Sequence, residues 1–195
     1  MKKSISLLLI IIALLTLVAC DKGNKMMTIS ATTLSENEES IIKLLNVPND
    51  SKVFDYALDN TVKSMTITSH TINEDLKWED QGAMSNDIKA SSGRIGITID
   101  DELQISIESG STGISTIKPD LTELLNQPMN YMHSTSWLSE SSIEPDKEIP
   151  LLLKVYTDSN SIVGYDTSSY FKPEHLKDND LVIAVTVCFS TDTTE

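Results

Sequence analysis

The residues of this chain that could do chemistry are scattered serines, lysines, histidines and carboxylates, with two cysteines. A Ser-x-x-Lys spacing, which can place a lysine amine beside a serine nucleophile, begins at Ser40, Ser115 and Ser169. The Ser-Asp-Asn and Lys-Thr-Gly companions that orient such a serine do not occur, and neither does Gly-x-Ser-x-Gly. We interpret the three matches as chance and predict no catalytic residue.

The histidines and the second cysteine give no metal or nucleophile pattern. His70, His133 and His175 lie far apart, and none has another His or Cys two to four residues on, as zinc ligands usually do. We expect them to be surface or loop residues, and we predict no metal or cofactor. Cys188 lies in an apolar run of an acidic protein, which favours a small buried thiol over a reactive thiolate.

Acidic residues cluster in three predicted turns or loops, at 100–102, 144–148 and 178–180. Calcium takes six to eight oxygen ligands, often from such loops, but the glycine and distant glutamate of an EF-hand are missing. Asp and Asn also favour turns without any metal. A calcium-dependent adhesion or sensor module therefore stays one alternative. A hydrolase of envelope or extracellular polymers that uses a carboxylate pair is another, although no pair can be chosen.

Aromatic residues gather in the C-terminal half of the chain, and three of them lie in the segment 158–180. Tyr165, Tyr170 and Phe171 could form a face that binds a glycan or peptide, because aromatic rings are the usual platform for such ligands. Packing in the core is the other interpretation.

The start of the chain has the three parts of an export signal. Lys2 and Lys3 form a positive region, the stretch 7–15 is entirely apolar, and small Ala19 comes before Cys20. Leu17-Val18-Ala19-Cys20 resembles the lipobox of bacterial lipoproteins. The resemblance implies a diacylglycerol with acyl chains such as palmitate on the Cys20 sulfur, and cleavage between Ala19 and Cys20. Two acyl chains give stable anchoring to a membrane.

The net charge of the mature chain limits the classes of molecule that it could bind. The formal net charge is −14, and loss of the two leader lysines leaves −16. Such a surface repels phosphate backbones, so we expect no nucleic-acid partner. No second apolar run approaches the ~20 residues of a membrane span. In enteric bacteria Asp21 would resemble a signal for inner-membrane retention, whereas in Gram-positive bacteria it would have no sorting meaning.

Three segments follow from these patterns: a signal peptide over 1–19, a flexible tether over 20–34, and one domain over 35–195. Ser35 and Glu38 form a capping-box pattern ahead of an apolar face, which predicts a short helix near 36–46 that lies against the domain. Pro48 ends it. Residues 109–116 are predicted as a loop, and 119–126 as a short helix.

The rest of the chain alternates with period two. Residues 94–99 and 103–107 predict a β-hairpin with one buried face, and 149–156 predicts a further strand. Both faces of 181–190 are largely apolar, which predicts a central strand. Seven or eight strands without βαβ rhythm favour a mainly β fold, an antiparallel β-sandwich, for which an immunoglobulin-like arrangement is one option.

The function predicted from the sequence is that of a membrane-anchored envelope or surface lipoprotein. Its lipid on Cys20 would hold the domain on the extracytoplasmic side of the cell membrane. No catalytic set is apparent in the sequence, which favours a non-catalytic binding or interaction domain over an enzyme. The ligand could be a protein, a peptide or a glycan.

Overall fold

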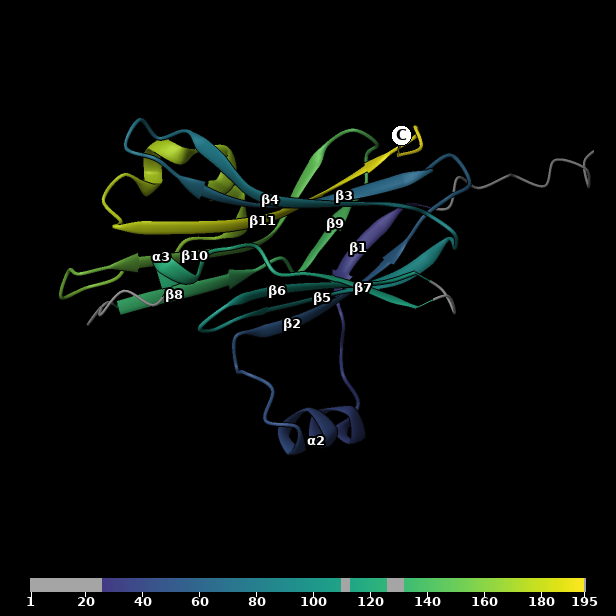
Figure 1. Ribbon diagram of the computed structural model, residues 1–195, viewed down its shortest axis with the longest axis horizontal. Helices are drawn as coiled ribbons and strands as arrows, with labels where there is room; N and C mark the ends of the chain where they lie inside the picture. Colours follow the sequence, from purple (N-terminus) through teal and green to yellow (C-terminus); the bar gives the residue numbers. More distant parts are fainter. Residues whose placement is uncertain (1–25, 110–112, 126–131, 195) are drawn as a thin grey trace, which may run out of the picture.

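The computed structural model describes residues 26–194 except 110–112 and 126–131, and it is built from two antiparallel sheets (Figure 1). The mainly β sandwich predicted from the sequence is confirmed. The six-stranded sheet contains, in spatial order, β7 (Ile114–Ile117), β6 (Leu103–Ser109), β5 (Ser92–Ile99), β2 (Ser51–Ala57), β1 (Thr28–Ala31) and β9 (Glu140–Ser142). The five-stranded sheet contains β4 (Trp78–Asp87), β3 (Ser64–Ile72), β11 (Leu181–Ser190), β10 (Glu148–Thr157) and β8 (Met132–Trp137).

The predicted hairpin forms as β5 and β6. Its register pairs Ile95 with Ile107, Ile97 with Ile105 and Ile99 with Leu103. All six side chains are buried because alternate residues of a strand face the same side. The acidic residues 100–102 form the turn.

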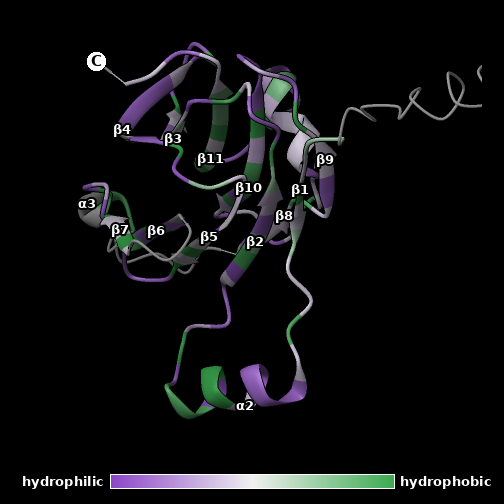
Figure 2. Ribbon diagram, turned by 90° about the vertical axis from the view of Figure 1, so that its right-hand side faces the viewer, coloured by the Kyte–Doolittle hydropathy of each residue, from purple (hydrophilic) through white to green (hydrophobic). Residues whose placement is uncertain are grey.

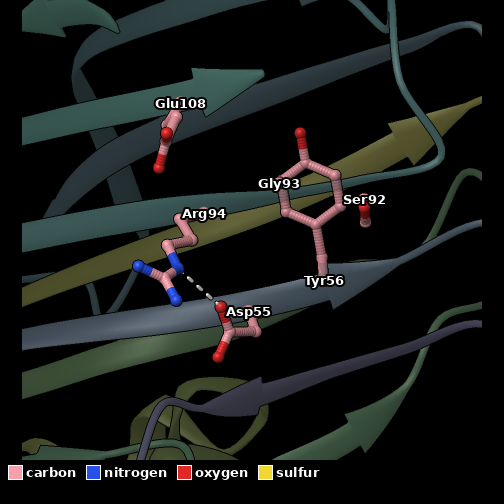
Figure 3. Close-up of a pocket in the computed structure, with 6 residues that line it drawn as sticks. All are labelled: Asp55, Tyr56, Ser92, Gly93, Arg94 and Glu108. Carbon is pink, nitrogen blue, oxygen red and sulfur yellow. Dashed lines mark hydrogen bonds and ion pairs between the residues drawn. The ribbon is translucent and has the colours of Figure 1, made fainter. Parts of the chain in front are cut away.

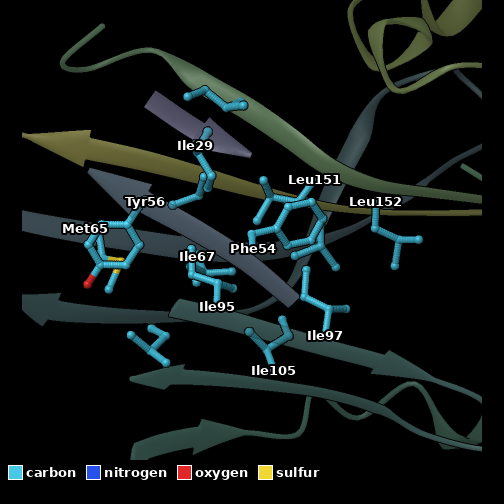
Figure 4. Close-up of a cluster of buried hydrophobic side chains, with 14 of the residues drawn as sticks. Ile29, Phe54, Tyr56, Met65, Ile67, Ile95, Ile97, Ile105, Leu151 and Leu152 are labelled. Atoms are coloured by element: carbon cyan, nitrogen blue, oxygen red, sulfur yellow. The ribbon is translucent and has the colours of Figure 1, made fainter. Parts of the chain in front are cut away.

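The core lies between the sheets and is largely aliphatic (Figure 4). Phe54 from β2 and Phe189 from β11 are fully buried, and the ring of Tyr56 lies 5.6 Å from that of Phe189. As predicted, β11 is the central strand of its sheet, between β3 and β10. Its other face is covered as well, which explains its two apolar faces.

A second, smaller core lies on that other face. The segment between β10 and β11 contains two short 3₁₀ helices, η1 (Thr167–Phe171) and η2 (Pro173–Leu176). Tyr170 and Leu176 from these helices pack on Val182 and Ala184 of β11. The segment therefore closes the outer face of the five-stranded sheet.

Part of the predicted tether is a strand. Residues 20–34 were expected to be flexible, yet Thr28–Ala31 forms β1, which pairs with β2 and β9. Ile29 is fully buried. The short run gave no clear period, so only its pairing with distant strands reveals it. Residues 1–25, which include Ala19 and Cys20, lie outside the described part of the chain.

The described residues hold eleven strands rather than seven or eight. The strands not anticipated are the short β1, β7 and β9, and β7 occupies part of the predicted 109–116 loop. The side chains of β7 are mostly exposed, so no alternation of apolar and polar residues marks it. The helix predicted over 119–126 is shorter than expected, as α3 (Thr122–Leu125).

Candidate binding surface

The helix α2 (Glu36–Leu44) forms where the capping-box pattern predicts it. The Ser35 backbone N–H donates to Glu38 Oε2 at 2.8 Å, and the Glu38 N–H donates to Ser35 Oγ at 3.4 Å. The backbone N–H and the hydroxyl of Ser35 both donate to the Glu38 carboxylate, and these two hydrogen bonds lower the pKa of Glu38. Lys43 in the last turn lies 3.5 Å from Glu39, which suits the helix dipole. The helix is therefore specified by its own residues.

The apolar side of α2 is not covered by the sandwich. The sequence predicted that this helix lies against the domain, and that prediction is wrong. No residue of the helix is buried, and the exposed fractions are 55% for Ile41, 84% for Leu44 and 69% for Leu45 at the C-cap. We call these three side chains the α2 apolar face. Figures 1 and 2 show α2 standing away from both sheets, and the hydropathy colours of Figure 2 show hydrophobic residues gathered at its C-terminal end.

The backbone on either side explains this position. After Leu45 the chain turns at Asn46, whose φ of 51° is left-handed, and Pro48 prevents the helix from continuing. The chain then returns to Ser51, where β2 begins. The helix is thus part of a connection between β1 and β2, held at both ends by neighbouring strands.

Three hollows lie beside the segment that follows α2, and Val47 and Pro48 line all of them. The most apolar hollow, of about 430 Å³, lies between α2 and β2 and β5, with Leu34, Ile42 and Val53 in its walls. A hollow of about 530 Å³ separates Leu45 from the acidic 100–102 turn.

The third hollow, of about 410 Å³, has a buried lysine in its wall. Lys154 is 4% exposed, and its Nζ lies 2.7 Å from Asp50 Oδ2 and 3.4 Å from the Ile99 carbonyl. Thr135 donates to the same Asp50 oxygen at 3.0 Å. Burial raises the pKa of Asp50, but the hydrogen bonds from Lys154 and Thr135 outweigh it and hold the pKa below its usual value.

Tyr156 lies two residues after Lys154 in β10. Burial, together with the charges of Asp50 and Asp100, raises the pKa of Tyr156. The Lys154 ammonium also lies 5.4 Å from the centre of the Tyr156 ring. Sequence reasoning missed this cluster. A lysine between the apolar residues of β10 was the available signal, because an ammonium inside an apolar strand needs a counter-charge.

A fourth, shallow hollow of about 260 Å³ lies on the six-stranded sheet (Figure 3). Arg94 Nε donates to Asp55 Oδ1 at 2.9 Å, and this contact raises the pKa of Arg94. The ring of Tyr56 lies over Gly93, where an added Cβ would stand 2.3 Å from the Tyr56 hydroxyl. Glycine is required at position 93 because the backbone there lies against both the Glu108 carbonyl oxygen and the Tyr56 ring.

The histidines are placed differently from one another. His133 and His175 are exposed, as predicted, but His70 is 3% exposed in β3, so that prediction is wrong. Its Nδ1 lies 2.8 Å from Asp80 and its Nε2 lies 2.9 Å from the Thr186 hydroxyl. A carboxylate, an imidazole and a hydroxyl in series can activate a nucleophile. Thr186 is 1% exposed, however, so the series joins three strands and its hydroxyl is closed off from solvent.

Of the two interpretations of Tyr165, Tyr170 and Phe171, core packing holds for Tyr170, and a shared aromatic face does not form. Tyr170 is 6% exposed and stacks on Trp78 with ring centres 4.8 Å apart, and its hydroxyl donates to Glu148 at 2.9 Å. Of the three rings, Tyr165 is half-buried and only Phe171 is exposed. Tyr170 therefore packs in the second core.

The remaining candidates are engaged with neighbours. Cys188 is a free, partly exposed thiol in β11, and its pKa is raised by burial and by Asp146 and Glu148. In the predicted acidic clusters, Glu102 pairs with Lys118 and Asp180 accepts from the Asp158 N–H. No hydrogen bond between described residues joins the serine hydroxyl and the lysine amine of a Ser-x-x-Lys match.

Within the described residues, no three His, Cys, Asp or Glu side chains are grouped so that they could hold a metal ion. That part of the chain also contains no helix long and apolar enough to cross a membrane. Compared with known protein families, with curated proteins and with solved structures, the chain matches none.

Proposed function

We propose that the mature chain is a lipid-anchored protein of the bacterial envelope whose β-sandwich is a non-enzymatic binding domain. The leader over residues 1–19, followed directly by Cys20, supports the anchor. The observation that supports binding is the α2 apolar face. Its side chains are exposed, and the helix that carries them is well capped and does not need them for its own formation. Exposed apolar side chains that lie next to one another commonly mark an interaction site.

The spacing of that face suits insertion into a groove. Ile41, Leu44 and Leu45 are separated by three and four residues, so they lie on one side of the helix. An amphipathic helix binds an apolar groove through anchors at this spacing. Burying a fully exposed Leu or Ile side chain stabilises by about 1.5–3 kcal/mol, so these three side chains would supply the apolar part of the binding free energy.

The direction of the chain supports display of α2 away from an anchor. Thr28, where β1 begins, pairs with Ala57 at the far end of β2, whereas α2 leads into Ser51 at the near end. β2 is about 20 Å long at ~3.3 Å per residue. The chain from a lipid on Cys20 would thus join the sandwich at one end, and α2 would lie at the other end.

The anchor is tested in a bacterium that processes lipoproteins. Cells that express the full chain or its Cys20→Ala variant are grown with alkyne-tagged palmitate. We expect the wild type to carry the tag, to be shortened by the leader and to remain with membranes after a high-salt wash. The variant should carry no tag and keep its leader. A wild type that sediments with membranes without any tag would disprove the lipid anchor.

The binding role is tested in the same cells with a photoreactive amino acid at position 44. Position 163 is the control, because Val163 is also a solvent-exposed apolar residue, 63% exposed, but lies outside α2. We expect a discrete cross-linked product from position 44 and none from position 163. Equal products from both positions, or none from either, would contradict a binding surface on α2.

A further inference from the structure

We infer that the partner of α2 is a cationic amphipathic polypeptide segment, with apolar side chains that cover the α2 apolar face and lysines or arginines at its border. This inference rests on the proposed binding function and names the chemistry of its ligand. It follows from the charges around the face and from the hollow at its C-terminal end.

Beside Leu45 the α2 apolar face is bordered by the acidic 100–102 turn, whereas the one lysine of the helix, Lys43, lies 3.5 Å from Glu39. Leu45 lines the same hollow as Asp100, Asp101 and Glu102. Glu102 is paired with Lys118, but within the part of the chain that the structure describes no ion pair includes Asp100 or Asp101. Both carboxylates are exposed. A partner that brings cations here gains charge-assisted contacts, which guide encounter and orientation.

The shape of the hollow suits a long basic side chain. Leu45, Val47 and Pro48 form one wall, and the acidic turn forms the other, around about 530 Å³. Lysine and arginine bury an apolar stem while the charged head stays polar. The stem would lie on the apolar wall and the head would reach Asp100 and Asp101. One such residue beside an apolar anchor would fix the position of the segment along α2.

Other occupants fit the charges less well. A second copy of this chain would bring another surface of a molecule whose mature charge is −16, and like charges at a border oppose association. Anionic lipid headgroups are repelled for the same reason. An amphipathic segment with basic residues satisfies both the apolar face and its border.

The test uses the full, processed chain in phosphatidylcholine vesicles and a labelled 14-residue helical peptide of leucine and lysine. Peptide bound to vesicles without protein is subtracted. Matched peptides replace every lysine with glutamate, or every leucine with serine. We expect the leucine–lysine peptide to bind at least about tenfold more tightly than either control, since one factor of ten needs only a single anchor or charge contact.

Two variants divide the apolar and charged contributions. Leu44→Ser with Leu45→Ser keeps the net charge, and we expect about tenfold weaker binding. Asp100→Asn with Asp101→Asn keeps the apolar face, and we expect weaker binding that also depends less on salt. Val163→Ser should bind as the wild type does, because it removes an exposed apolar side chain elsewhere. Thermal unfolding of each variant checks that the domain is intact.

Several outcomes would overturn the inference. These are equal binding of the lysine and glutamate peptides, unchanged binding by both double variants, or a change from dimer to monomer in sedimentation when Leu44 and Leu45 become serine. Release of the chain from vesicles by that same change would instead assign the face to the membrane. Palmitate labelling is read on the same samples, so a missing anchor is distinguished from a missing ligand.

Discussion

The ammonium of Lys154 lies 2.7 Å from the carboxylate of Asp50, and this ion pair joins the two sheets of the sandwich. Lys154 belongs to β10 in the five-stranded sheet, whereas Asp50 directly precedes β2 in the six-stranded one. The lysine side chain is 5% exposed and that of the aspartate 30%. Both residues line one hollow together with Asn46, Val47 and Pro48, which belong to the segment that leads from α2 to β2.

Removing the Asp50 carboxylate should destabilise the fold more than removing the Lys154 ammonium. Asp50→Ala leaves the Lys154 ammonium buried without its carboxylate, and we expect a loss of about 3 kcal/mol in the free energy of unfolding. Lys154→Met keeps the apolar stem and should cost less. Urea unfolding followed by Trp fluorescence measures both. A larger loss for Lys154→Met would show that the ammonium itself stabilises the domain.

The same pair should give the domain a dependence on pH at the acid end. The pKa of Asp50 is lower in the folded chain than in the unfolded one. Its contribution is therefore fully present above its unfolded pKa, near 3.9, and is lost as the pH falls through the folded value. The stability difference between wild type and Asp50→Asn should be constant above about pH 5 and shrink below pH 4. A difference that persists at the lowest pH would contradict this assignment.

Gly93 and Gly96 lie on the same strand and should respond differently to alanine. At Gly93 the added Cβ would stand 2.4 Å from the Glu108 carbonyl oxygen, which belongs to the paired strand and cannot easily move. We expect Gly93→Ala to lower the free energy of unfolding by about 1–3 kcal/mol, as overpacking does. Nothing lies within 4 Å of a Cβ at Gly96, so Gly96→Ala should be neutral or stabilise by up to about 1 kcal/mol. Equal effects in urea unfolding would mean that the strands separate freely there.

The number of free thiols reports the state of Cys20. The chain has two cysteines, and Cys188 is free in the structure. A processed chain with lipid on Cys20 should therefore give one thiol per molecule in denaturant. In the folded chain Cys188 should be alkylated slowly at neutral pH, because burial, Asp146 and Glu148 raise its pKa. Two thiols in denaturant would show that Cys20 carries no lipid.

Local patterns predicted a large part of this fold. The hairpin of β5 and β6, the central strand β11 and the capping box of α2 each depend on neighbours in sequence, and each forms as expected. Alternation with period two determines which side chains share a face, and a capping box needs only residues three positions apart. The leader and Cys20 remain a prediction from sequence alone, since they lie outside the described residues.

Contacts between distant residues decided the rest. Asp50 and Lys154 are 104 positions apart, and His70 and Thr186 are 116 positions apart, so no local pattern could have joined either pair. The same holds for the α2 apolar face. The sequence shows that a helix has an apolar side, but only the packing of the other elements shows whether that side is covered. Here the strands that flank α2 use their apolar residues for their own core, and the helix is left exposed.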